Sequence, residues 1–402
     1  MEDARPRRPW FLQSRFAAGM VALLVVLAAA VVVAMAALWP TGDPPAGGGS
    51  ASMDTQRARV TAVRDGACKA GAGAEGCRRV LAVVETGVDT GVEIGMDIGP
   101  GFGIDVGDRI RVVDNNLADG ATIGGQAADA YSFADFERRG SLMWLAAGFA
   151  LLVVLAARWR GLLALTGLVL SLAVIVAFIV PAILDGRDAV GVALVGSLAI
   201  LLVTLGLAHG LGPKTVAAAL GTAAALLLTL MLGRFATGAA EITGFGSEEA
   251  AFLQASGSDV SIRGLLLAGI VIAALGVLDD LTVTQASAVL ALRRANPGYG
   301  ARVLFTEALK VGRDHIVAVV NTLVLAYAGA SLPVLLVFAL ADTSFSEALN
   351  SEAVAAEVVA TLVGSMGLIA AVPLATGIAA ALAARMPPEA VPAAGGHHGH
   401  MH

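Results

Sequence analysis

The chain has 402 residues, of which 57% are hydrophobic and only 14% are charged, and its mean hydropathy is +0.79. Soluble domains carry about 25% charged residues, so this composition, with several apolar runs long enough to cross a bilayer, excludes a soluble globular protein. The formal net charge of −6 offers no basic surface of the kind that nucleic acid requires.

The N-terminal segment is predicted to be a basic stretch followed by a membrane anchor. Residues 1–15 are basic, and residues 16–39 are almost entirely apolar. A cleavable signal peptide is the alternative, because Ala34-Met35-Ala36 fits a cleavage site. The apolar run exceeds the roughly 7–15 residues of a signal core, so we expect an uncleaved anchor.

A flexible linker and a β domain are predicted next. Residues 40–55 are rich in Pro, Gly and Ser, as flexible linkers are. In residues 56–135, apolar side chains alternate with polar residues and glycine, for example at Val92, Ile94, Met96 and Ile98. This pattern predicts a small β-barrel or sandwich of about five strands.

The two cysteines, Cys68 and Cys77, both fall within this β segment. In an extracytoplasmic domain we expect them to form a disulfide. A two-cysteine metal site is the alternative, and the absence of a nearby His or further Cys in the sequence argues against it.

Residues 141–384 are predicted to form a bundle of seven transmembrane helices, which together with the anchor makes eight. The expected spans are 141–157, 162–184, 189–208, 215–235, 262–281, 316–340 and 354–384. Pairs of small residues four positions apart predict close helix packing, and these pairs are Gly206/Gly210, Ala193/Ser197, Gly269/Ala273 and Ala360/Gly364. Residues 385–402 form a His-rich tail.

The distribution of Lys and Arg in the loops predicts which side of the membrane each loop occupies. With both termini in the cytoplasm and the β domain outside, the inner loops hold Arg158, Arg160, Lys214, Arg293, Arg294, Arg302, Lys310 and Arg313. The outer loops then hold only Arg187, Arg234 and Arg263. The excess of positive charge inside favours this orientation.

Two adjacent carboxylates, Asp279 and Asp280, interrupt the apolar run of the 262–281 span. An Asp at the centre of a membrane helix costs about 2.5–3.5 kcal/mol, so such residues persist where they face a bundle interior, a water-filled cavity or a partner. Asp280 shares a helix face with Thr284 and Ser287. The residues after the Asp pair also permit a local helix break, where secondary transporters place their sites.

A second polar group opens the 316–340 span, where Asp314 shares a helix face with Asn321, and His315 with Thr322. Both groups are expected in the cytoplasmic half of the bilayer. Carboxylate and amide oxygens suit hard cations, whereas His with Asp suits zinc or manganese. Together these side chains predict a cation or proton site, with Asp280 and His315 as the candidate metal ligands and no other cofactor.

Purely structural roles are the alternative for these residues. The Asp pair would end a helix at the membrane interface, neutralised by nearby arginines, and Asp314 would cap the next helix. His209, at the cytoplasmic end of the 189–208 span, is a further candidate neighbour of the site.

Four sequence features together resemble the YibE/F family of bacterial polytopic membrane proteins. They are residues 131–139, 243–249, 276–287 and 312–333, and the resemblance covers roughly residues 60–382. It implies an N-terminal anchor, an extracytoplasmic β domain and a helical bundle in the bacterial inner membrane, with a transporter-like role.

We therefore expect a protein that lies in the lipid bilayer and moves a small solute or ion, with a cation favoured, and that forms a homodimer. One alternative is an accessory envelope subunit that binds a partner through its β domain. The sequence has no His-Glu-x-x-His, Gly-x-Ser-x-Gly or Gly-rich phosphate motif, so no enzyme class is indicated. An intramembrane aspartyl protease using Asp280 and Asp314 is a remaining alternative, disfavoured by the adjacency of the Asp pair.

Overall fold

The computed structural model describes residues 10–42, 55–65, 77–99, 101–115, 122–123, 126–127, 129–255, 260–341 and 343–387. The chain divides into two compact units. One is helical and comprises residues 1–46 and 157–402, and the other, residues 47–156, combines a β-sheet with one helix.

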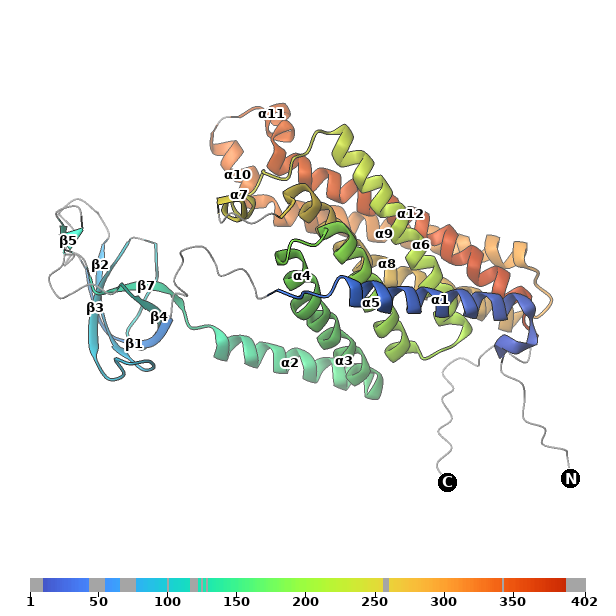
Figure 1. Cartoon of the computed structure of the whole chain (residues 1–402), viewed down its shortest axis with the longest axis horizontal. Coiled ribbons are helices and arrows are strands. Elements are labelled where there is room, and N and C mark those ends of the chain that lie inside the picture. Colours follow the sequence, from blue (N-terminus) through green and yellow to red (C-terminus); the bar gives the residue numbers. More distant parts are fainter. Residues whose placement is uncertain are drawn as a thin grey trace, which may run out of the picture. The chain divides into compact units, whose positions relative to one another are not determined.

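The smaller unit is built on a five-stranded antiparallel sheet with the strand order β3-β2-β1-β4-β7 (Figure 1). Its strands are β1 (Thr55–Asp65), β2 (Arg78–Val84), β3 (Glu93–Ile98), β4 (Arg109–Asp114) and β7 (Tyr131–Phe136). A separate two-stranded sheet pairs β5 (Thr122–Ile123) with β6 (Gln126–Ala127).

Alternation along the strands gives this sheet one buried face. In β2, for example, Val80, Ala82 and Val84 are buried while the residues between them are partly exposed. The edge strands β3 and β7 contact each other, so the single sheet curls around its own core. The predicted strands are thus present as one curled sheet. Cys77 lies just before β2, and Cys68 lies outside the described residues.

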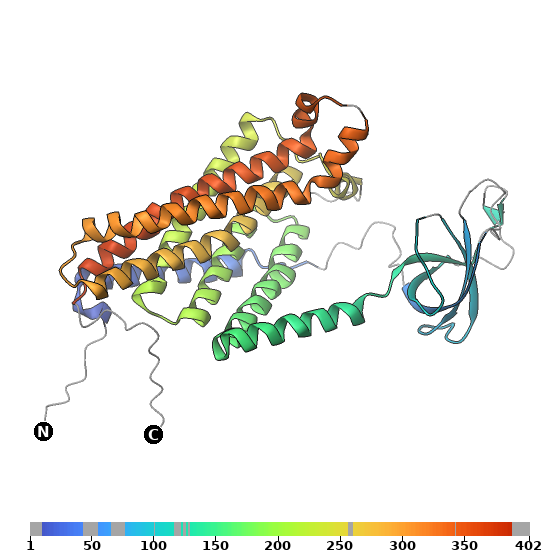
Figure 2. The same cartoon turned by 180° about the vertical axis from the view of Figure 1, so that it is seen from behind.

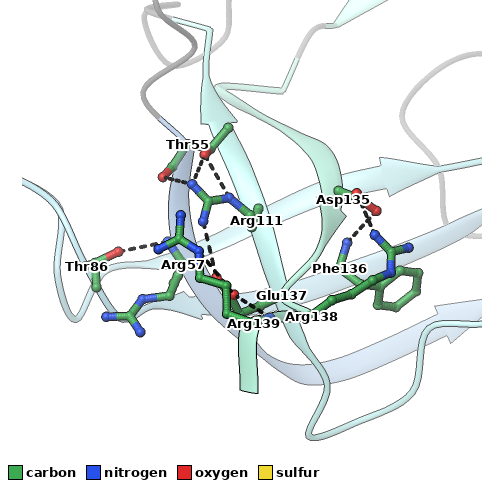
Figure 3. Close-up of polar contacts among 9 residues, drawn as sticks. All are labelled: Thr55, Arg57, Thr86, Arg111, Asp135, Phe136, Glu137, Arg138 and Arg139. Atoms are coloured by element: carbon green, nitrogen blue, oxygen red, sulfur yellow. Dashed lines mark hydrogen bonds and ion pairs between the residues drawn. The ribbon is translucent and has the colours of Figure 1, made fainter. Parts of the chain in front are cut away.

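Glu137 joins this sheet to α2 (Arg139–Ala157), as Figure 3 shows. Its carboxylate lies 3.2 Å from Nη1 of Arg111 on β4 and accepts a hydrogen bond from the backbone N–H of Arg139 at 3.2 Å. Burial disfavours ionisation of Glu137, whose side chain is only 8% exposed. The hydrogen bonds and the charges of Arg139 and Arg111 outweigh that burial and place the pKa of Glu137 below its ordinary value. The first turn of α2 is therefore attached to the sheet by a charged contact.

Within the described residues, seven helices are long and apolar enough to cross a membrane. They are α1 (Arg15–Ala37), α2, the segment Trp159–Leu184, α5 (Ala189–His209), α6 (Pro213–Ala239), α8 (Ile262–Ala295) and α12 (Glu352–Ala384). The helices α9 (Ala301–Ala330) and α10 (Leu332–Leu340) meet at a bend of 53° and make an eighth span if counted as one. The predicted total of eight therefore includes one broken span.

Shorter helices complete the larger unit. They are η1 (Trp10–Gln13), α4 (Val180–Leu184), α7 (Glu248–Ala255) and α11 (Phe345–Asn350). Helices α6, α8 and α12 pack against one another at its centre, and α9 lies along α12 (Figures 1 and 2). Small residues make this contact close: a Cβ added at Gly221 of α6 would lie 2.9 Å from Cα of Ala375 on α12.

The segment predicted as one helix over 162–184 contains an irregular turn. Helix α3 (Trp159–Val174) continues through a π-helical turn, η2 (Ile175–Ile179), before α4. Pro181 lies two residues after this turn, in α4. Since proline has no N–H to donate and its ring crowds the carbonyl four residues earlier, a local widening of the helix is the expected response.

Helix α8, in contrast, runs unbroken through Asp279 and Asp280, where the sequence permits a break. The hydroxyl of Thr282 donates to the carbonyl oxygen of Asp279 at 3.1 Å, and that of Ser287 to Val283 at 2.7 Å. These bonds follow the helix direction and leave its own hydrogen bonds in place, so the weak helix formers do not interrupt it.

Glu352, the first residue of α12, binds the loop between α6 and α7. Its carboxylate accepts hydrogen bonds from the backbone N–H groups of Thr243, at 2.8 Å, and Gly244, and from the Thr243 hydroxyl. Gly244 has a φ of +96°, a conformation that glycine adopts readily. A Cβ added at Gly246 would lie 2.8 Å from the backbone nitrogen of Ala353. The 243–246 segment therefore closes one end of the bundle.

Arg293 stabilises the opposite end of the helical bundle through hydrogen bonds. This buried side chain donates to the carbonyl oxygens of Tyr299, at 2.8 Å, and Pro297 in the turn between α8 and α9. It also donates to the carbonyl oxygen of Met386, just beyond α12, at 3.4 Å. One guanidinium group thus joins the α8–α9 turn to the end of α12.

Candidate functional site

One carboxyl oxygen of Asp279, on α8, is buried without a hydrogen-bond partner. The residue is partly buried, and within the described part of the chain its Oδ1 atom has no hydrogen-bond partner. The hydroxyl of Thr204 on α5 lies close enough to the carboxyl group to interact with it, but it donates its hydrogen bond to the carbonyl oxygen of Ile200 in its own helix, at 2.8 Å. A carboxylate can only accept hydrogen bonds or bind cations, so an unpaired buried oxygen of this kind calls for a donor such as water, a proton of its own or a bound cation.

Asp280, the next residue, is exposed on the bundle surface among charged neighbours. It lies close enough to His209, the last residue of α5, to act on the imidazole electrostatically, as do Lys214 of α6 and Arg160 of α3. The Lys214 Nζ and His209 Nδ1 atoms are 3.4 Å apart. Four helices thus contribute to one mixed-charge cluster that adjoins Asp279.

Two buried polar pairs extend along α8 from this cluster. The hydroxyls of Thr222 and Thr282 hydrogen-bond at 2.6 Å, and Thr376 of α12 donates to Oε1 of Gln285 at 3.0 Å. Among the described atoms, Nε2 of Gln285 is buried and unpaired. Gly312 of α9 packs so closely that an added Cβ would lie 3.0 Å from that nitrogen. A polar seam therefore follows α8 through the apolar core.

Sequence reasoning noted that Gln285 can hydrogen-bond, but it did not find Thr204, Thr222 or Thr376. The available signal was weak, since each is a single polar residue within an apolar run, and in a membrane such residues commonly face the bundle interior. Helical periodicity predicts which face of its helix a residue occupies, but it does not predict which other helix covers that face.

The remaining predicted residues of α8 are less prominent. Thr284 and Ser287 are both partly buried, and Ser287 uses its hydroxyl within the helix, as described above. They therefore accompany Asp280 along α8, as the spacing predicted, without a described contact to another helix.

The predicted residues of α9 do not join the Asp pair through any described hydrogen bond or ion pair. Asp314, Asn321 and Thr322 are exposed, and His315 is partly buried. The Thr322 hydroxyl donates to the carbonyl oxygen of Ala318 in its own helix, at 2.9 Å. The structure places Asp279 and Asp280 beside α5 and leaves the polar residues of α9 on the outside of the bundle.

No group of three or more His, Cys, Asp or Glu side chains that would hold a metal ion is found among the described residues. A cation bound at Asp279 would therefore complete its coordination with hydroxyl, carbonyl or water oxygens, which suit hard ions. The pairing of Asp280 with His315 stays a prediction, and the imidazole that lies within electrostatic range of Asp280 is that of His209.

Comparison with known proteins identifies one family. The model of the family described as "YibE/F-like protein" matches residues 145–385, more than half of the chain. No curated protein and no solved structure matches the chain.

Proposed function

Because this chain belongs to the YibE/F-like family, and because its apolar helices indicate a membrane protein, we propose that it moves a small cation or protons across the membrane. Asp279 is the binding group in this proposal, and Asp280 adjusts the local charge. The single observation that supports it is the buried, unpaired Oδ1 atom of Asp279.

Three features of the surroundings favour a cation over an anion. The unpaired atom is an acceptor, and its neighbour Thr204 offers a hydroxyl oxygen. A second carboxylate, Asp280, follows directly in the chain.

The proposed protein lies in the bacterial cytoplasmic membrane with both termini in the cytoplasm and the sheet-containing unit outside. The excess of Lys and Arg in the loops assigned to the inside supports this orientation. A reporter fused in the Asn296–Gly300 turn should report a cytoplasmic location, and one at Gly246 an extracytoplasmic location. Reversal of either signal contradicts the orientation.

Transport is tested with purified protein in liposomes, by following protons with a trapped pH-sensitive dye and Mn²⁺ with a metal-quenched dye. The variant Asp279→Asn keeps the size of the side chain but removes its charge. We expect it to insert normally and to be no less stable, because losing a charge near hydrocarbon relieves a desolvation cost. Flux of the transported ion should fall to the level of empty liposomes.

The matched control is Glu249→Gln, an equally conservative change at an exposed carboxylate of α7. It should leave flux near the parental value. Full activity of Asp279→Asn, or no flux of either ion in the parent protein, contradicts the proposal. If Asp279 only stabilised the fold, Asp279→Asn would lower the thermal midpoint together with the flux.

A further inference from the structure

The second half of α9, beyond Gly312, packs on the bundle along one side only among the described residues. Its fully buried residues are Leu304, Ala308 and Gly312, all in the first half of the helix. Gly312 marks the side that packs on the bundle, because a Cβ added there would lie 2.6 Å from Val372 of α12. Beyond Gly312, among the described residues, α9 presents most of its circumference to the outside.

The side of α9 opposite Gly312 is not a plain lipid-facing surface. At 100° per residue, Lys310, Asp314, Asn321, Leu325 and Ala328 fall within about 40° of one line along the helix, and all five are exposed. We call these five residues the α9 face. It carries an amide and two charges. Exposed residues on other sides of α9 include apolar Val317, which is 72% exposed, and polar Arg313 and Thr322.

Asn321 is the residue of this face that a lipid environment explains least well. It lies seven residues beyond Asp314, about 10 Å along the helix axis. The hydroxyl of Thr322 donates a hydrogen bond within its own helix. The side-chain amide of Asn321, in contrast, has no hydrogen-bond partner among the described residues. An unpaired amide facing hydrocarbon costs several kcal/mol, whereas Asn side chains in membrane helices characteristically hydrogen-bond across a helix–helix contact.

We propose that a second copy of this chain covers the α9 face, with the two α9 helices parallel and related by a two-fold axis along the membrane normal. Such an axis keeps every residue at its own depth, so each residue meets the same residue or its close neighbours in the other copy. Any surface that pairs in this way must be complementary to itself.

The α9 face meets this requirement. An amide has both donors and an acceptor, so two Asn321 side chains at one depth satisfy each other. Lys310 already pairs with Glu307 in its own helix at 2.7 Å, while Asp314 has no ion-pair partner among the described residues. One turn separates Lys310 from Asp314, so Lys310 of one copy reaches Asp314 of the other. Ala328 is small and lets the helices approach.

This inference does not depend on the transport proposal, because it concerns the outside of α9 and not the contact of α8 with α5. Crosslinking tests it in the full chain, in native membranes. The variant Asn321→Cys, oxidised with copper phenanthroline, should give a covalent dimer on a non-reducing gel. The parent chain, treated in the same way, accounts for any product of Cys68 or Cys77.

The matched control is Val319→Cys, two residues away on the same helix but facing the bundle, where Val319 packs against the core. It should give no covalent dimer. If Asn321→Cys inserts poorly, Leu325→Cys on the same face replaces it. Absence of a covalent dimer at both positions of the face, or an equal yield at Val319→Cys, overturns the proposal.

A second measurement tests how strongly the two copies associate. Energy transfer between labelled copies in liposomes should show that Asn321→Leu raises the dimer dissociation constant about 3- to 17-fold, the effect of losing one interhelical polar contact in a membrane. Thr322→Val, which removes a hydroxyl bonded within the helix, should leave the constant unchanged. Unchanged association of Asn321→Leu, or capture of a different protein by the Asn321→Cys chain in place of its own copy, overturns the proposal.

Discussion

Replacing Gly221 by alanine tests the close contact between α6 and α12. An added Cβ would lie 2.8 Å from Cβ of Ala375 and 2.9 Å from its Cα, whereas carbon atoms in ordinary contact are about 3.5–4.0 Å apart. The two helices must therefore separate by about 0.6–1 Å at this level. Because one of the opposing atoms belongs to the backbone, no side-chain rotation relieves the clash.

Overpacking of this kind costs about 1–3 kcal/mol, and the higher helix propensity of alanine returns at most about 1 kcal/mol. We therefore expect Gly221→Ala to destabilise the bundle. The control is Gly364→Ala on α12, where an added Cβ meets nothing within 4 Å, so this change should be neutral or slightly stabilising. The two variants should differ by about 1–3 kcal/mol.

The measurement is the thermal midpoint of each purified variant in one detergent at one protein concentration, with Gly221→Leu as a larger insertion at the same place. The expected order of midpoints is Gly364→Ala highest, then Gly221→Ala, then Gly221→Leu. Equal midpoints for the two alanine variants would show that α6 and α12 do not approach as closely as described, and would refute the reasoning.

Three further outcomes are expected. Replacing Glu352 by alanine removes the acceptor of the 243–246 segment, so hydrogen exchange of the Gly244 amide should quicken, consistent with a loss of about 1–3 kcal/mol of local stability; unchanged exchange would contradict this role. The pKa of Glu137 is lowered in the folded protein, so its stabilising contribution is present above the ordinary Glu pKa of about 4.3 and is lost as the pH falls through the lower folded value. Exchange of the β4 and β7 amides, corrected for intrinsic rates, should therefore increase on acidification from pH 6 to pH 3, and the increase should be smaller in Glu137→Gln; identical pH profiles would be evidence against it. If Cys68 and Cys77 form the predicted disulfide, protein from oxidising membranes should resist alkylation until a reductant is added, and free thiols in such protein would reject the bridge.

Hydropathy predicted the apolar helices well because a membrane helix is defined by its own composition. The span predicted over 189–208, for example, is α5, Ala189–His209. The length of α8 was underestimated, since the polar residues after Asp280 looked like an ending but are accommodated within the helix. The local sequence does not indicate which acceptor such a hydroxyl group will hydrogen-bond.

The composition of the candidate site was harder to predict than its existence. Intramembrane carboxylates are conspicuous in a sequence, so Asp279 and Asp280 were found. His209 was named as a candidate neighbour, but the other neighbours come from α3, α5 and α6, between 66 and 120 residues away in the chain. Pairing between helices depends on the packing of the whole bundle. The close approach of Gly221 to Ala375 was missed for the same reason, whereas Gly206, Gly269 and Gly364, which belong to small-residue motifs, face open space.

The length of α8 has a mechanical consequence. Its 34 residues span about 51 Å at 1.5 Å per residue, against a hydrocarbon core of about 30 Å. The helix is therefore about 20 Å longer than the core is thick, and Arg293 joins its end to the end of α12. Because α8 is continuous, this one contact also fixes the height of Asp279 relative to the end of α12.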